Sequence, residues 1–157
     1  MTTFQIFGLQ FAMSLVLYAL LAAWYVAPRL ARLPLAAALP PLLWLHAFRH
    51  LGLVFLVPTV VGPPLQPAFA VPAAYGDLLA ALLALLAIVA LRRGWAAAVA
   101  LAWLFNVVGA LDLLHALYQG TRWQVQLGSA YYIPTFAVPA LLVTHAMIFA
   151  RLARRAG

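Results

Sequence analysis

The 157-residue sequence contains no cysteine, no lysine and no glutamate. Without cysteine the chain cannot form a disulfide, hold an iron–sulfur cluster or use a thiol nucleophile. Charged residues make up only 7% of the chain, whereas a soluble globular domain has about 25%. Intrinsic disorder is also excluded, because it requires low hydrophobicity and high net charge.

Apolar residues dominate what is present. They account for 68% of the chain, and the mean hydropathy is +1.07. A helix that crosses a bilayer needs about 20 consecutive apolar residues. The length suits one domain, so we expect an all-α integral membrane protein with a bundle of five transmembrane helices. The expected spans cover residues 4–26, 35–61, 75–91, 95–118 and 130–152.

The nine basic residues are all arginine, and seven of them fall on one side of the predicted bundle. The positive-inside rule places that side in the cytoplasm, so we expect an outside N-terminus, a cytoplasmic C-terminus and location in the inner (cytoplasmic) membrane. The first span has no basic residues before it and is too long for a cleaved signal, so we expect it to be retained. Because these seven arginines mark helix ends, we expect the chain's partner to be the lipid bilayer rather than nucleic acid. The seven are Arg29, Arg32, Arg92, Arg93, Arg151, Arg154 and Arg155.

Prolines interrupt several of the predicted spans and crowd one connection. Pro40, Pro41, Pro134 and Pro139 fall inside expected helices, where proline produces kinks. The apolar, proline-rich segment 62–72 is expected to lie along the outer interface as an extended lid.

The informative residues are the polar ones inside the spans. A charge at the bilayer centre costs about 2.5–3.5 kcal/mol on insertion scales, so such residues face the bundle interior and usually serve a function. All four histidines and both aspartates of the chain belong to this set. The candidates are His46, Arg49, His50, Asp77, Asn106, Asp112, His115, Thr144 and His145.

Helical spacing sorts these residues by face and depth. With 1.5 Å of rise per residue, we expect an inner cluster in the cytoplasmic half and an outer cluster in the opposite half. The i, i+3 and i, i+4 spacings place His46, Arg49 and His50 on one side of the second span. The inner cluster is His46, Asn106, Thr144 and His145. The outer cluster is Arg49, His50, Asp77, Asp112 and His115.

Arg49 needs a counter-ion, because an arginine is never neutral in a protein. The two aspartates are the only carboxylates in the side-chain set, and Asp112 lies within reach of an outward-pointing arginine. The sequence therefore predicts an Arg49–Asp112 ion pair. A purely structural pair that fixes helix register remains the alternative.

The polar set favours a redox membrane protein that binds a b-type haem or a quinone. Haem in a helix bundle takes histidine ligands from facing helices, and His46 and His145 are at similar depth on different spans. They are the predicted axial ligands. His50 and His115 are further candidates for cofactor binding, while Arg49, Asp77, Asn106 and Asp112 form the surrounding polar site.

Three other functions stay open on the sequence alone. The polar set could form a proton-coupled transporter or a channel for a small solute or anion. His50 and Asp112 could act as a general base in an enzyme of lipids or isoprenoids. Alternatively, the polar set could have no role beyond specifying helix packing in a structural or assembly subunit. In any of these roles we expect a homo-oligomer or a membrane complex. We expect no metal site, because Arg49 lies between the His46 and His50 pair and repels a cation.

Overall fold

The computed structural model describes residues 1–62 and 65–154, and within them the chain is helical with no strands. Five helical segments are long and apolar enough to cross a membrane. They are Thr3–Ala31, Leu35–Leu56, Pro67–Arg93, Ala98–Arg122 and Gly128–Ala153. Five such helices are compatible with a multi-pass membrane protein.

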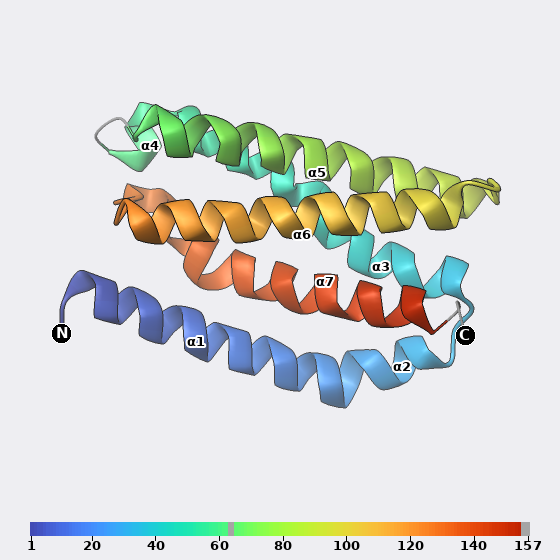
Figure 1. Ribbon diagram of the computed structural model, residues 1–157. Coiled ribbons are helices and arrows are strands. Elements are labelled where there is room, and N and C mark those ends of the chain that lie inside the picture. Colours follow the sequence, from blue (N-terminus) through green and yellow to red (C-terminus); the bar gives the residue numbers. More distant parts are fainter. Residues whose placement is uncertain (63–64, 155–157) are drawn as a thin grey trace.

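The first segment comprises α1 (Thr3–Leu21), a π-helical turn η1 (Ala22–Val26) and α2 (Ala27–Ala31). Thr2 caps α1 by accepting a hydrogen bond from the Gln5 backbone N–H, and the Gln5 side chain accepts one from the Thr2 backbone N–H in return. No residue of α1 is buried. The helix packs mainly against α7 (Val138–Ala153), so it lies at the edge of the bundle (Figure 1).

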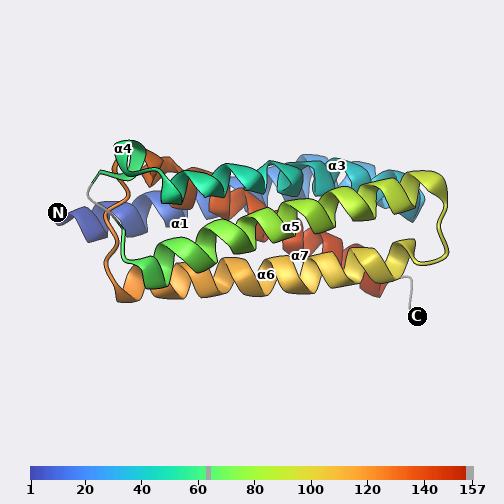
Figure 2. The same ribbon diagram turned by 90° about the horizontal axis from the view of Figure 1, so that it is seen from above.

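The second segment changes its winding halfway along. It starts as α3 (Leu35–Ala47) and continues as the 3₁₀ helix η2 (Phe48–Leu56), after which α4 (Pro58–Val61) forms one short turn. The third and fourth segments are α5 (Pro67–Arg93) and α6 (Ala98–Arg122), which pack side by side along their lengths (Figure 2).

The lid predicted over 62–72 is wrong for residues 67–72, because α5 begins at Pro67. A proline in the first helical turn loses nothing by lacking an N–H, since that group has no partner in the helix. Pro72 is accommodated farther along the same helix. Residues 63–64 of the predicted lid lie outside the described part of the chain.

The fifth segment begins with the 3₁₀ turn η3 (Gly128–Tyr131) and the π-helical turn η4 (Ile133–Ala137), and then continues as α7. In η4 the Val138 N–H donates to the Ile133 carbonyl, five residues back. Pro139 follows directly and has no N–H to donate. The wider π turn therefore lies where proline interrupts the regular α-helical pattern.

Two apolar clusters fill the two halves of the bundle. One lies toward the end that carries the end of α7 and the α5–α6 turn, here called the C-terminal end. The other lies toward the end that carries the start of α1, here called the N-terminal end (Figure 1). The C-terminal cluster includes Leu39, Leu43, Ala84, Ala87, Phe105, Ile148 and Leu152, all buried. The N-terminal cluster includes Phe55, Val61, Phe69, Ala73, Ala74, Leu127 and Ala130.

The helix bounds place six of the seven arginines expected on one side at the C-terminal end. The seventh, Arg155, lies outside the described residues. The polar side chains expected inside the spans lie between the two apolar clusters. Those that are buried are His46, Arg49, Asn106, Thr144 and His145, and Thr135 is a further buried polar residue.

Candidate functional site

A buried arginine joins three helices at the centre of the bundle. The Arg49 side chain, on η2, is only 1% exposed. Its Nε donates to Oδ1 of Asp77 on α5 over 2.7 Å, and its Nη2 donates to Oδ2 of Asp112 on α6 over 2.6 Å. Nη1 donates to the Gly109 carbonyl over 2.9 Å. The ion pair predicted between Arg49 and Asp112 is present, and Asp77 is a second counter-ion.

Glycines allow the two carboxylates to approach neighbouring helices. The Asp77 carboxylate lies against Gly52 and the Asp112 carboxylate lies against Gly76, so closely that a β-carbon at either glycine would overlap it. A β-carbon on Gly109 would lie 3.1 Å from Arg49 Nη1, which is also too close for comfortable packing. The ion-pair geometry therefore requires these small residues.

The network continues from the arginine to His145 and Asn106. Nδ1 of His145 lies 2.7 Å from Oδ1 of Asn106, and Asn106 Nδ2 donates to the His145 backbone carbonyl over 3.1 Å. Because the amide nitrogen is used by that carbonyl, the amide oxygen accepts, and His145 Nδ1 carries the proton. His145 Nε2 is then the lone-pair nitrogen, and it faces Arg49 Nη1 at 3.5 Å.

His46 lies beside His145 and has one unpartnered nitrogen. Its Nε2 is 3.0 Å from the Thr144 hydroxyl oxygen, and that hydroxyl also lies 3.0 Å from the backbone carbonyl of Ala140. If the hydroxyl donates to its own helix, it accepts from His46 Nε2. The buried Nδ1 of His46 has no hydrogen-bond partner among the described residues.

The two histidine rings pack directly on one another and on Phe105. The His46 and His145 centroids are 4.1 Å apart, and Phe105 stacks against His145 at 5.4 Å and meets His46 edge-on at 5.0 Å. A bis-histidine haem needs the porphyrin between its two ligating rings. Rings in contact, with three of their four nitrogens facing protein groups, do not fit a haem iron between them.

The remaining two histidines make no hydrogen bond to this network among the described residues. His50 is exposed, and its Nδ1 is 2.9 Å from the backbone carbonyl of Ala47 in its own segment. His115 is exposed on α6. The structure thus brings together all of the predicted inner cluster, with Arg49, Asp77 and Asp112 from the outer one. Arg49 connects the two groups through His145.

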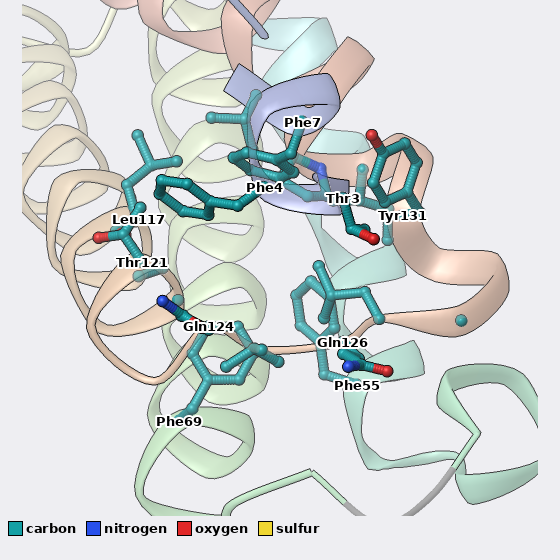
Figure 3. Close-up of a pocket in the computed structure, with 18 of the residues that line it drawn as sticks. Thr3, Phe4, Phe7, Phe55, Phe69, Leu117, Thr121, Gln124, Gln126 and Tyr131 are labelled. Carbon is teal, nitrogen blue, oxygen red and sulfur yellow. The ribbon is translucent and has the colours of Figure 1, made fainter. Parts of the chain in front are cut away.

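Two cavities adjoin the network. A lateral cavity of about 540 Å³ lies between α1–η1, α3–η2 and η4–α7, and its lining includes Arg49, Asp77 and Thr144 among mainly apolar side chains. An end cavity of about 370 Å³ lies at the N-terminal end of the bundle and is lined largely by aromatic, aliphatic and amide side chains (Figure 3). Asp77, Leu113, Ile133 and Val138 line both cavities.

Sequence reasoning missed the glycines and the ring that support the site. Gly52, Gly76 and Phe105 were not among the candidates, although a glycine inside a long Ala- and Leu-rich helix costs about 1 kcal/mol and therefore signals a close approach. Phe105 carries no comparable signal, because an apolar ring is ordinary in such a span. Among the described residues, no three histidine or aspartate side chains are placed to hold a metal ion.

Comparison with protein families assigns the chain to one family. Residues 6–153 match the family described as a domain of unknown function, DUF8737, and the chain belongs to this family. Comparisons with the curated proteins and with the solved structures found no match.

Proposed function

We propose that this protein is a redox-type membrane protein that binds a lipid-soluble quinone in the lateral cavity. The observation that carries the proposal is the cavity's composition: apolar walls, with Tyr18, Arg49, Asp77 and Thr144 as the lining residues that carry polar groups. Small-molecule sites typically combine mainly apolar walls with a few polar groups that orient the ligand. A quinone matches both parts of such a site, because its ring has two carbonyl acceptors for the polar groups and its isoprenoid tail suits the apolar walls.

Donors for a quinone carbonyl are available at the polar end of the cavity. The Arg49 guanidinium has five N–H donors. Hydrogen bonds to neighbouring protein groups use one N–H on Nε, one on Nη2 and one or two on Nη1. At least one N–H thus remains for a ligand, and Thr144 adds a hydroxyl. Because the two aspartates fix the guanidinium plane, binding would cost little side-chain entropy.

The position of α1 supports entry from the lipid. Tyr18, Leu21 and Ala22 of the first segment line one wall, and Leu45 and Phe48 of the second line another. A ligand dissolved in the bilayer would enter beside an edge helix that has no buried residue of its own.

The packing toward the C-terminal end argues against a conduction pathway. The two buried histidine rings pack on Phe105, which belongs with Leu43 and Ile148 to the buried C-terminal cluster. Polar groups of the network therefore do not continue into that half of the described bundle. A site that opens sideways and toward one end suits ligand binding better than transport across the bundle.

We also propose that the C-terminal end faces the cytoplasm and that the protein resides in the inner membrane. Six described arginines gather at that end, as the positive-inside rule expects for a cytoplasmic face. The chain has no cysteine, so single cysteines can be introduced without interference. On intact cells a membrane-impermeant maleimide should label Ser129→Cys and spare Arg154→Cys, and the reverse pattern would refute this orientation.

Filling the cavity tests quinone binding. Ala140 lines the lateral cavity, whereas Ala146 on the same helix is exposed and lines neither cavity. In calorimetric titrations of detergent-solubilised protein with a short-chain ubiquinone and a short-chain menaquinone analogue, Ala140→Phe should weaken binding at least about tenfold. Ala146→Phe is the matched control and should bind like the wild type. Absence of binding to the wild type, or equal affinity of both variants, would overturn the proposal.

A further inference from the structure

We propose that the end cavity is a second binding site, specific for an organic ammonium cation. The inference is independent of quinone binding, because it rests on the other cavity and on the charge balance of the network. It is carried by three observations: a single charged lining residue, a set of aromatic rings around the cavity, and an excess of carboxylates over guanidinium in the network to which that charged residue belongs.

Asp77 is the one charged residue in the lining of the end cavity among the described residues. Its Oδ1 accepts from Arg49, whereas no described group donates a hydrogen bond to Oδ2. The side chain keeps 13% of its surface exposed. No positive side chain lines the end cavity in the described residues, so a cation that enters it would meet a carboxylate whose Oδ1 alone is held by Arg49.

The network has two carboxylates for one guanidinium. With Asp77 and Asp112 both ionised, Arg49 balances only one of them, and one negative charge is left in largely buried surroundings. An uncompensated buried charge is costly, so a positive ligand beside Asp77 would be favoured. Neutral or anionic ligands would gain nothing from this imbalance.

Aromatic rings surround the space in which the cation would lie. Phe4 and Phe7 of α1 lie on one side, and Phe55 and Phe69 lie on the other (Figure 3). Edge-on ring packing supports both sides. The ring centroids of Phe7 and Tyr131 are 6.0 Å apart, and those of Phe55 and Phe69 are 5.7 Å apart. Cations are attracted to the faces of aromatic rings, which is how quaternary ammonium groups are recognised in proteins.

The remaining lining suits an ammonium group with an organic substituent. Gln124, Gln126 and Thr121 supply amide and hydroxyl oxygens near the mouth, and Leu113 and Leu117 supply apolar surface. A small inorganic ion would leave most of the roughly 370 Å³ unfilled. The ligand could be a free amine or quaternary ammonium compound, or the ammonium headgroup of a lipid, since both present the same chemistry.

The test compares two probes of equal shape and different charge. The probes are 3-hydroxyphenyltrimethylammonium and its uncharged carbon analogue 3-tert-butylphenol, titrated calorimetrically into the full chain in phosphatidylglycerol nanodiscs, with empty nanodiscs subtracted. We expect saturable binding of the cation, at least about tenfold tighter than the phenol. Equal affinity for both probes, or no saturable binding of the cation, would overturn the proposal.

Variants locate the site and protect the test against misfolding. Asp77→Asn should remove most of the preference for the cation. Phe4 is half exposed, so Phe4→Leu should leave the fold intact while weakening the cation several-fold more than the phenol. Phe48→Leu is the matched control, because Phe48 is similarly exposed but does not line the end cavity. Equal cation affinity in Phe4→Leu and Phe48→Leu would refute this location.

Two further measurements distinguish a lipid headgroup from a free cation as the ligand, and distinguish cation binding from quinone binding. If a lipid headgroup is the natural occupant, phosphatidylcholine in the nanodiscs should compete and weaken probe binding, whereas a free cation site should be unaffected by the lipid. Ala140→Phe fills the lateral cavity without lining the end cavity, so it should retain cation binding even if quinone binding is lost or was never present.

Discussion

The Asp77 carboxylate lies directly against the backbone of Gly52, with no room for a side chain between them. This contact brings α5 close enough to η2 for Asp77 to accept a hydrogen bond from Arg49. Asp112 and Gly76 repeat the arrangement between α6 and α5. In both cases a helix presents a glycine to an aspartate of the next helix, and the buried charge network depends on that spacing.

A methyl group at Gly52 should therefore be costly. We expect Gly52→Ala to lower the free energy of unfolding by about 1–3 kcal/mol, the usual range for overpacking a tight contact. Dodecyl sulfate titration of the protein in mixed micelles, followed by circular dichroism, measures this. Gly8→Ala is the control, because a β-carbon there meets no atom within 4 Å, and it should be neutral or slightly stabilising.

Loss of the guanidinium should leave two carboxylates without compensation. We expect Arg49→Met to destabilise the protein by about 3–5 kcal/mol, as for other broken buried pairs. The triple variant Arg49→Met, Asp77→Asn, Asp112→Asn removes all three charges and should recover much of the loss. If the triple variant unfolds as early as the single one in the same titration, repulsion between uncompensated carboxylates is not the cause.

Asn106 contributes through His145. Asn106→Leu has similar volume but removes the acceptor of the His145 Nδ1 proton and the donor to the His145 carbonyl. An unpaired buried polar group costs about 1–3 kcal/mol, so the melting temperature in detergent should fall by several degrees. The control is Thr121→Val on the same helix, because the Thr121 hydroxyl donates only to backbone carbonyls of its own helix. This variant should change the melting temperature little. A similar fall in both variants would contradict the specific role of Asn106.

The histidine geometry predicts that the protein does not bind haem between His46 and His145. Protein expressed with haem available and purified in detergent should show no Soret band, oxidised or dithionite-reduced. His46→Ala should have the same featureless visible spectrum. A Soret band in the wild type that His46→Ala removes would show that the two rings separate to admit a porphyrin.

The spans and the central ion pair could be predicted from the sequence because each rests on a strong physical constraint. An apolar run of about 20 residues needs a bilayer, and a buried Arg49 needs a carboxylate. Asp77 was harder to place as a partner. The proline-rich composition of 62–72 predicts an extended lid just before Asp77, whereas α5 begins at Pro67 and carries Asp77 well inside the helix.

The misplacement of His50 has a geometrical cause. The i, i+4 rule that grouped His46 with His50 assumes 3.6 residues per turn, but the chain winds as a 3₁₀ helix from Phe48 onward. With three residues per turn, His50 turns away from the side that His46 and Arg49 share. His115 is three residues from Asp112 and about 60° around α6 from it, so it shares that side of the helix but is exposed and makes no hydrogen bond to the network among the described residues.

The π turn at 133–137 acts as a rotational offset between the two parts of the fifth segment. Each residue turns an α-helix by about 100°, so a helix without the additional residue would present a different face after Pro139. Deleting Ala137 would keep the apolar character and nearly the length of the span, yet it would rotate Thr144 and His145 relative to Tyr131 and Thr135. The pairing of His145 with Asn106 is therefore set by a residue count some ten positions earlier, which hydrophobicity alone does not record.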